Sequence, residues 1–247
     1  FDLAAGRVEV VPTAHYFMGG VVVDTDTRTA LPSLYVAGED AGGAHGANRL
    51  GGNGVANSTV YGGIAGDVMG RDIAGQTSLR EADEGALSAE IERAMAPVGR
   101  SGGNIHELRR ALQDVMWDEV GVIRTAEGMT RALDRLDEID SALMDTGVAA
   151  GNLAFNLTWH DWLNMRSLVD ISKVITHAGL ARENSRGAHY REDFPEVGEL
   201  ESSYFTKAIT AGDDVKVTRA PVAFTIVKPG ETILPAGEPD TLVAAAE

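Results

Sequence analysis

Residues 45–54, which read HGANRLGGNG, hold the side chains best suited to chemistry. Four glycines in this stretch permit positive φ angles and let a ligand approach the backbone closely. Between the glycines lie the imidazole of His45, the guanidinium of Arg49 and two amide side chains. A planar guanidinium is well suited to a carboxylate or a phosphate group. The stretch therefore predicts a site for an anionic ligand.

The element expected to position this stretch is a helix of small, apolar and buried residues over residues 55–67. The unpaired N–H groups of its first turn would favour a negative charge, as Arg49 would. The alternative is a glycine-rich turn before a core helix, with Arg49 in an ordinary salt bridge. A pattern of spaced glycines does not decide between the two interpretations.

Short β-strands are expected before the glycine-rich stretch, at residues 8–11, 21–23 and 31–38. The last of these ends in a glycine followed by Glu39. A carboxylate at the carboxyl end of a strand in an open α/β sheet lies where nucleotides bind, and it can accept hydrogen bonds from sugar hydroxyls. A glutamate in a surface loop is the alternative. His15, which stands beside aromatic residues, is by itself most simply a core or interface histidine.

The sequence changes character after residue 75, where a polar and charged segment separates the glycine-rich region from strongly helical sequence. Amphipathic helices are expected at 104–119, 125–145 and 158–178, with Asn104 and Glu107 forming the cap of the first. Their Met and Trp residues are interpreted as core positions. Residues 215–218 and 222–227 alternate like short strands, and an extended tail follows from residue 229.

These observations predict three parts. Residues 1–75 form an α/β segment, residues 76–200 an all-α three-helix bundle, and residues 201–247 an extended tail with short strands. The loop 182–191 carries three arginines beside several acids and is interpreted as a salt-bridged surface loop without a catalytic role.

Composition excludes several classes of site. The chain has 247 residues, no cysteine and a formal net charge of −16, so it can form neither a disulfide nor a thiolate metal site, and nucleic acid is a disfavoured partner. No apolar run is long enough for a membrane span. The three histidines His106, His160 and His177 lack the spacing of metal ligands, and no metal site is predicted. A cytoplasmic or membrane-peripheral location is expected.

Four motifs occur in one order along the chain and together resemble a known family. They are HYFMGG at 15–20, VAGE at 36–39, HGANRLGGN at 45–53 and NSRGAHYREDFP at 184–195. This pattern is similar to the flavoprotein subunit of succinate dehydrogenase and fumarate reductase, over residues from about 12 to 195. The last fifty residues are much less diagnostic.

The resemblance implies FAD as cofactor and a dicarboxylate, succinate or fumarate, as substrate. It implies that His15 and Arg49 bind a substrate carboxylate, and that Glu39 holds the ribose or ribityl hydroxyls of FAD. Asn53, Gly54 and Val55 are implied cofactor-binding residues, the last two through backbone N–H groups near the flavin ring. The implied reaction is a hydride transfer between flavin and substrate, with electrons passing on through a possible iron–sulfur partner subunit.

The glycine fingerprint GxGxxG, which binds the FAD pyrophosphate, follows no strand in this chain. The chain, which starts at Phe1, is therefore interpreted as the second part of an FAD domain followed by a helical domain, with an N-terminal half as its partner. Alone it is expected to be inactive. Three alternatives stay open: a relative of L-aspartate oxidase or adenylylsulfate reductase, a non-catalytic module that docks an iron–sulfur subunit, and a general anion-binding protein.

Overall fold

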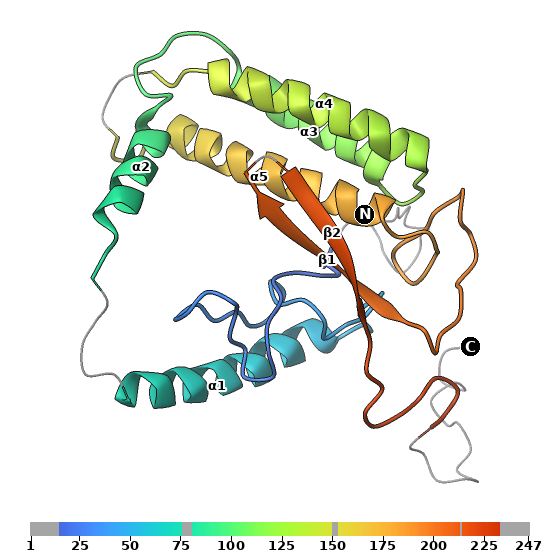
Figure 1. Ribbon diagram of the computed structural model, residues 1–247. Coiled ribbons are helices and arrows are strands. Elements are labelled where there is room, and N and C mark those ends of the chain that lie inside the picture. The colour runs from blue at the N-terminus through green and yellow to red at the C-terminus, as the bar shows by residue number, and fades with distance from the viewer. Residues whose placement is uncertain (1–14, 76–80, 150–152, 213, 233–247) are drawn as a thin grey trace, which may run out of the picture.

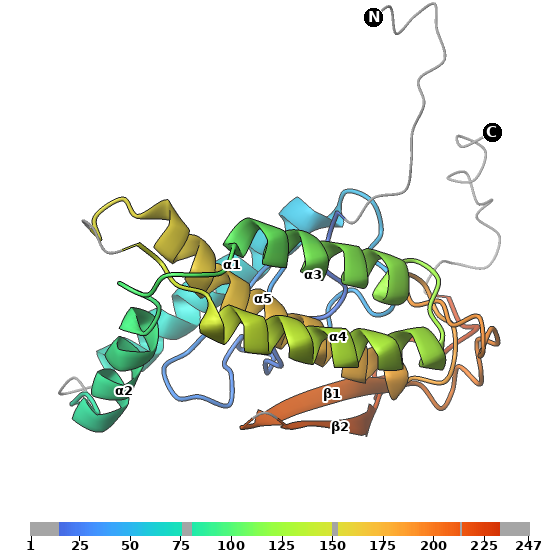
Figure 2. The ribbon, with the colours of Figure 1, turned by 90° about the horizontal axis from the view of Figure 1, so that it is seen from above.

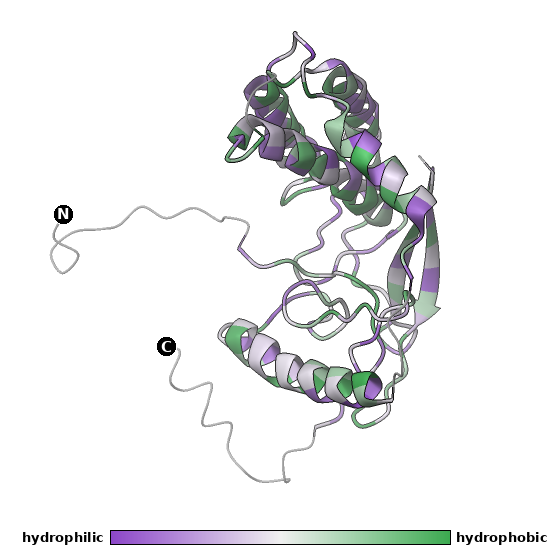
Figure 3. Cartoon of the chain, turned by 90° about the vertical axis from the view of Figure 1, so that its left-hand side faces the viewer, coloured by the Kyte–Doolittle hydropathy of each residue, from purple (hydrophilic) through white to green (hydrophobic). Residues whose placement is uncertain are grey.

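The computed structural model describes residues 15–75, 81–149, 153–212 and 214–232. In these residues it contains five helices and one antiparallel strand pair. Helix α1 lies apart from the other helices, and loops and the strand pair occupy the space between (Figures 1 and 3). Among the described residues, no helix combines the length and the hydropathy needed to cross a membrane.

Three helices form the bundle that the sequence predicts: α3 (Ile105–Val120), α4 (Ala126–Asp145) and α5 (Leu157–Leu180). Helices α3 and α4 lie side by side, and α5 packs against both (Figures 1 and 2). The predicted cap of α3 is confirmed, because the Asn104 side chain accepts hydrogen bonds from the first turn and donates to Glu107 Oε1 at 2.9 Å. Thr125 caps α4 in the same way.

The core of the bundle is made of aliphatic side chains together with Met and Trp, as expected. Trp162 is 1% exposed, and its indole N–H donates to the carbonyl oxygen of Leu143, so that its one polar atom is satisfied inside the core. The buried members of the main cluster are Ile105, Leu112, Leu136, Ile139, Leu143, Val148, Trp162, Met165 and Val169. Leu168 and Ile171, which also fit the helical pattern, are exposed.

Helix α1 (Asn53–Ala74) begins where the sequence predicts, but the expectation that it is buried is wrong for this chain. Only Asn57, Ala65 and Val68 are buried. Apolar side chains such as Val55, which is 79% exposed, are left uncovered, while Tyr16 and Arg28 from the preceding loops bond to Asn57 and Asp72 of the helix. The pale and green colouring of α1 in Figure 3 reflects this small and apolar surface.

Helix α2 (Glu84–Met95) was not predicted, and it begins at the end of the charged segment 76–85 that was interpreted as a boundary. Asp83 caps it by accepting hydrogen bonds from the N–H groups of Gly85 and Ala86. The helix has no buried residue. The indole N–H of Trp159 on α5 donates to the carbonyl oxygen of Ala94 at 2.7 Å and so holds the end of α2 against the bundle.

The α/β description of the first part is not borne out within the described residues. The predicted strands at 21–23 and 31–38 form only isolated bridges, Val21 to Ala41 and Arg28 to Tyr35. A single strand without neighbours cannot complete a ladder of hydrogen bonds, so these segments run as turns and loops. The strand predicted at 8–11 lies outside the described residues. The division of the chain at residues 75 and 200 stays a prediction.

The strand pair consists of β1 (Tyr204–Ala211) and β2 (Asp214–Pro221), with Tyr204 opposite Pro221. The predicted strand at 215–218 lies within β2. The strand predicted at 222–227 is wrong, because the chain leaves the sheet after Pro221, and β1 takes the pairing position instead. Both strands contact α5. Most of the predicted extended tail lies outside the described residues.

Candidate functional site

Arg49 lies on the loop before α1, stacked on an aromatic ring. Its guanidinium carbon is 4.4 Å from the centre of the Tyr16 ring, and Nη1 donates to the carbonyl oxygen of Leu50 at 3.2 Å. Its Nε is buried without a hydrogen-bond partner, and no ion pair joins it to an acid among the described residues. The ordinary salt bridge considered as an alternative is therefore not present in this part of the chain.

Beside Arg49 lies a polar cluster that the sequence analysis missed, formed by Tyr16, His45 and Asn57. Asn57 Nδ2 lies 3.0 Å from the Tyr16 hydroxyl, 3.0 Å from His45 Nε2 and 3.1 Å from the carbonyl oxygen of Gly38. The rings of Tyr16 and His45 meet edge to face with centres 5.3 Å apart. This cluster fixes the ring on which Arg49 rests. A lone asparagine in a small, apolar helix was the signal that could have revealed it.

The first turn of α1 faces this cluster with its backbone donors free of side-chain caps. Gly52 occupies the capping position with φ 83°, no side chain accepts from the first turn, and that turn contains no acid. A Cβ atom at Gly54 would lie 3.0 Å from the Tyr16 ring and 3.8 Å from Arg49 Nη1. The glycine therefore lets tyrosine and arginine approach the helix terminus. Free N–H groups beside an unpaired guanidinium form a setting for an anion.

Glu39 anchors the segment that carries His15 and Tyr16. Its Oε1 accepts a hydrogen bond from the backbone N–H of Phe17 at 2.9 Å, and the residue is otherwise exposed. His15 is exposed and precedes the tyrosine beneath Arg49. The structure thus gathers Glu39, the residues from His15 onward, Arg49 and the start of α1 at one end of that helix. Their roles in binding stay predictions.

A second contact holds the other end of α1. Arg28 donates from Nε and Nη2 to the two carboxylate oxygens of Asp72, both at 3.0 Å, and the Tyr35 hydroxyl donates to the same carboxylate at 2.6 Å. These hydrogen bonds, that of Arg28 foremost, lower the pKa of Asp72 to about 2. The loop that carries Arg28 and Tyr35, before Glu39, is therefore held against α1.

The interpretation of the loop 182–191 as a salt-bridged surface loop holds only in part: among the described residues only Arg191 of its three arginines forms an ion pair, and that arginine is buried. Arg191 is 1% exposed, and it donates from Nε and Nη2 to the two carboxylate oxygens of Asp193, both at 2.7 Å. Its Nη1 lies within 3.2 Å of three carbonyl oxygens, those of Gly179, Leu180 and Arg182, at the end of α5. Arg191 thus caps the helix C-terminus, where a positive charge is favourable.

The same loop supports the stretch that carries Arg49. The N–H of Ala188 donates to the carbonyl oxygen of Ala47 at 2.9 Å, and a Cβ atom at Gly187, whose φ is 54°, would lie 2.5 Å from that oxygen. Behind the loop, Arg124 Nη1 lies 2.9 Å from His189 Nδ1. Burial, followed by the neighbouring charge of Arg124, lowers the pKa of His189 to about 4, which favours the neutral imidazole.

No group of acids and histidines among the described residues could hold a metal ion. His106, His160 and His177 lie on helices, the first two near the starts of α3 and α5 and the third in the last turn of α5. The site is therefore built from a guanidinium, imidazoles, amides and backbone N–H groups, which together can bind a negatively charged ligand.

Comparison with known proteins identifies two family models along the chain. The fumarate reductase flavoprotein C-terminal model matches residues 109–234, and the FAD binding domain model matches residues 6–55. One of the subunits of fumarate reductase (CoM/CoB) from Methanothermobacter marburgensis is 36% identical over 196 residues, which are 79% of this chain and 35% of the relative. L-aspartate oxidase of Yersinia pestis is 35% identical over 199 residues, 79% of this chain and 34% of the relative. The chain thus spans about a third of the length of these relatives.

Comparison with solved structures also finds flavoprotein chains of this kind. The Mycobacterium smegmatis Sdh1 complex in the apo form matches with a TM-score of 0.80 and 32% identity, over 92% of this chain and 39% of the solved chain. Adenylylsulfate reductase of Archaeoglobus fulgidus, with a TM-score of 0.60 and 20% identity over 75% of this chain and 31% of that one, shares the fold alone. With both family models in the order that the sequence motifs predict, this chain belongs to the family of the flavoprotein subunits of fumarate reductase and succinate dehydrogenase.

Proposed function

We propose that this chain is the substrate-binding and C-terminal part of an FAD-dependent oxidoreductase that interconverts succinate and fumarate. The observation that carries the proposal is Arg49, whose guanidinium has no acidic partner among the described residues and whose Nε is buried and unpaired. A buried donor without a partner is costly unless a ligand satisfies it. A dicarboxylate supplies such an acceptor together with the opposite charge.

In this proposal Arg49 grips one carboxylate of the substrate, and stacking on Tyr16 keeps the guanidinium plane in place. Cation–π stacking and the planar fork together fix both the position and the orientation of the charge. Asn57, through its contacts with Tyr16 and His45, keeps the tyrosine ring from turning. Exposed His15, one residue before Tyr16, adds a donor for the same carboxylate. The substrate carbons would thus be held in one orientation.

FAD, when bound, supplies the hydride-transfer chemistry of this family. Several features of the chain fit such a group. Glu39 has one carboxylate oxygen free to accept a sugar hydroxyl, and the uncapped N–H groups of Gly54 and Val55 can face an electron-rich ring edge. Gly38, with φ 86°, is buried against Ser58 Oγ, so the backbone there is closely packed. We assign Glu39, Asn53, Gly54 and Val55 to cofactor binding on this basis.

The partner proteins follow from the same proposal. An N-terminal half would supply the pyrophosphate-binding fingerprint, which this chain lacks, and would cover the apolar surface of α1. An iron–sulfur subunit would accept the electrons, and a complex of this kind would lie in the cytoplasm or at the membrane through its partner subunits.

L-aspartate oxidase is the second candidate, because that relative from Yersinia pestis is nearly as similar as the fumarate reductase relative. An amino-dicarboxylate has the same two carboxylates for Arg49 and His15, so the geometry described above serves both substrates. A non-catalytic docking module is the third candidate. The exposed apolar side chains of α1 are compatible with it, but it gives no role to the unpaired guanidinium of Arg49.

The test is flavin reduction by substrate. The chain, co-expressed with an N-terminal half and loaded with FAD, is mixed without oxygen with succinate or with L-aspartate, and the visible flavin absorbance is followed. The proposal expects bleaching by succinate and reoxidation by fumarate. Bleaching by L-aspartate alone would assign the protein to the oxidase class, and bleaching by neither substrate would contradict both assignments.

A further inference from the structure

A second concentration of positive charge lies far along the sequence from Arg49. Arg182, Arg186 and Arg219 gather where the loop after α5 meets the strand pair. Arg182 and Arg219 both stack on Tyr204, with guanidinium carbons 4.5 Å and 4.8 Å from the ring centre. No carboxylate among the described residues forms an ion pair with any of the three. This is unexpected in a chain with a net charge of −16, where acids outnumber basic residues.

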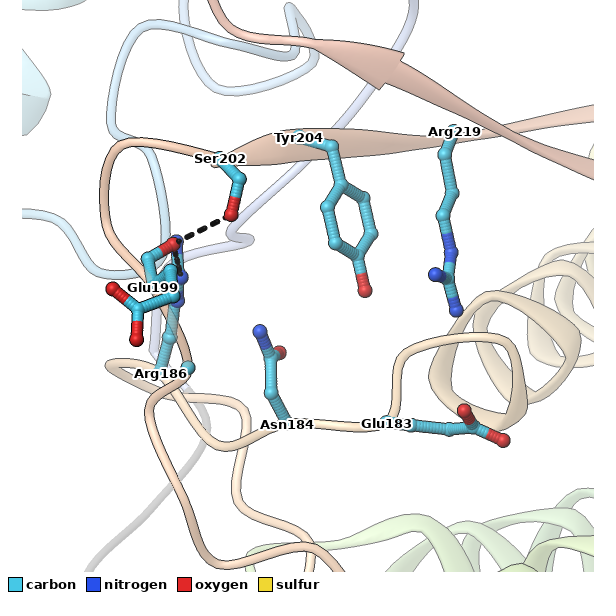
Figure 4. A pocket seen from close by; sticks show the side chains of 8 residues that line it. Glu183, Asn184, Arg186, Glu199, Ser202, Tyr204 and Arg219 are labelled. Carbon is cyan, nitrogen blue, oxygen red and sulfur yellow. Dashed lines mark hydrogen bonds between the residues drawn. The ribbon is translucent and has the colours of Figure 1, made fainter.

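Arg186 and Arg219 line a hollow of about 230 Å³, and Arg182 lies next to it on the Tyr204 ring. In Figure 4 the Tyr204 hydroxyl and the Arg219 guanidinium extend into it from the strands, and the Asn184 amide extends toward them from the opposite wall. Two acids, Glu183 and Glu199, also line the hollow, and in this view both carboxylates point away from Asn184 and Tyr204. The polar atoms that face one another across the hollow are therefore mostly hydrogen-bond donors.

The donors around the hollow are only partly used. Within the described part of the chain Arg219 makes one hydrogen bond, from Nη2 to the carbonyl oxygen of Ala181 at 3.2 Å, of the five that a guanidinium can donate. Arg186 uses each of its three nitrogens once, toward Val197, Ser203 and Glu199, which leaves a second N–H on both terminal nitrogens. Among the described residues, no hydrogen bond from the Tyr204 hydroxyl to another group is found. The carboxylates in the lining, those of Glu183 and Glu199, accept no ion pair from these arginines among the described residues.

The positive charges around the hollow also favour a ligand that accepts hydrogen bonds and is negatively charged. Burial lowers the pKa of Arg182, and the charges of Arg186 and Arg219 lower it further, so the three cations repel one another in a partly desolvated setting. The hydrogen bonds of Arg182 go to neutral oxygens and do not compensate this charge. An anion in the hollow would offset the repulsion and accept the free donors.

We propose that the hollow between the loop 183–202 and the strand pair binds a small oxyanion, a phosphate or carboxylate group, through Arg219, Arg186, Tyr204 and Asn184. The site is separate from Arg49 and does not depend on the proposed redox function. The alternative is that the three guanidiniums only fasten the loop to the strands through their bonds to carbonyl oxygens.

Inorganic phosphate is the probe, titrated into the 247-residue chain at constant ionic strength maintained with chloride, with binding followed by calorimetry. The proposal expects saturable binding with a stoichiometry of one at this site. Arg219→Gln, which removes an exposed charge, should weaken it at least about tenfold, because hydrogen bonds to charged groups are the strong ones. Tyr204→Phe should weaken it less, since it removes one neutral donor only.

Two matched controls locate the site. Arg71→Gln on α1 removes a charge of equal size from an exposed residue without an ion pair among the described residues, and it should leave phosphate binding unchanged. Arg49→Gln removes the anion-binding guanidinium of the candidate site, and in this background Arg219→Gln should still weaken phosphate binding by the same factor. The proposal is overturned if binding does not saturate, if Arg219→Gln binds phosphate like the parent chain while remaining folded by circular dichroism, or if Arg49→Gln abolishes the binding.

Discussion

The substitution Gly187→Ala adds one methyl group between two segments of the candidate site, the loop 182–191 and the stretch that carries Arg49. This methyl group should push the two segments apart. The loop that contains Gly187 touches the Arg49 stretch backbone to backbone, through the hydrogen bond from Ala188 to Ala47. In Gly187→Ala the new Cβ atom would lie 2.5 Å from the Ala47 carbonyl oxygen and 2.6 Å from its carbonyl carbon. Ordinary contacts between such atoms are about 3.5 Å, so one segment must move by roughly 1 Å.

Two contributions give the size of the effect. A non-glycine residue at φ 54° loses roughly 1–2 kcal/mol, and forcing an extra carbon into a filled space typically adds about 1–3 kcal/mol. The total is roughly 2–5 kcal/mol, local to this contact. Gly198→Ala, between the loop 182–191 and β1, is the matched control, because its φ is 74° but its Cβ atom would meet only ordinary contacts at 3.6 Å and 3.7 Å. Gly198→Ala should therefore lose only the roughly 1–2 kcal/mol that a non-glycine residue at positive φ costs.

Hydrogen exchange at the Ala188 amide measures this contact directly. A loss of about 2 kcal/mol corresponds to roughly thirtyfold faster exchange through local opening. Gly187→Ala should therefore exchange at least that much faster than the parent chain, and clearly faster than Gly198→Ala. Equal exchange in the two variants would refute the argument that the loop supports the Arg49 stretch by close backbone contact.

Other expectations concern the cofactor, the pH dependence and the isolated chain. In the FAD-loaded complete protein, Glu39→Ala should weaken flavin retention roughly tenfold to a hundredfold, whereas Glu138→Ala on the surface of α4 should not, as flavin content after gel filtration would show. The pKa of His189 is lowered from 6.5 to about 4, so the unfolded chain binds a proton in this range that the folded chain does not, and stability should fall as the pH falls from about 6.5 to about 4. Denaturation at several pH values should find a smaller pH dependence in His189→Gln; an unchanged slope would contradict the assignment. The chain expressed alone should be colourless and inactive, and retention of one FAD per chain would show this to be wrong.

The helical bundle could be predicted from local sequence because its signals are local. The cap at Asn104, the cap at Thr125 and the period of the apolar residues each depend on neighbours within about one turn. Helix α2 has the same kind of signal, since Asp83 precedes it, but Asp83 lies in the charged segment 76–85 that was interpreted as a boundary. A charged segment can form a helix without burying any residue, as α2 does.

The candidate site was predicted in part. The glycine-rich stretch indicated an anion site beside Arg49, and the unpaired guanidinium agrees with that interpretation. The cluster of Tyr16, His45 and Asn57 was missed because it joins residues that lie 41 and 12 positions apart. The burial of Arg191 was missed for a similar reason, since the carbonyl oxygens that receive it belong to the end of α5.

The Arg49→Lys variant of the complete, FAD-loaded protein tests the central claim most directly. Lysine keeps the charge but loses the planar fork and the stacking on Tyr16, so a bidentate grip on a carboxylate is lost. With turnover, bound flavin and Tm measured on one preparation, kcat/KM for succinate or fumarate should fall by at least about a hundredfold, equal to about 2.7 kcal/mol, while flavin content and Tm stay close to those of the parent. Near-normal turnover by Arg49→Lys, or a loss of activity only in step with flavin and Tm, would contradict the claim that Arg49 binds the substrate.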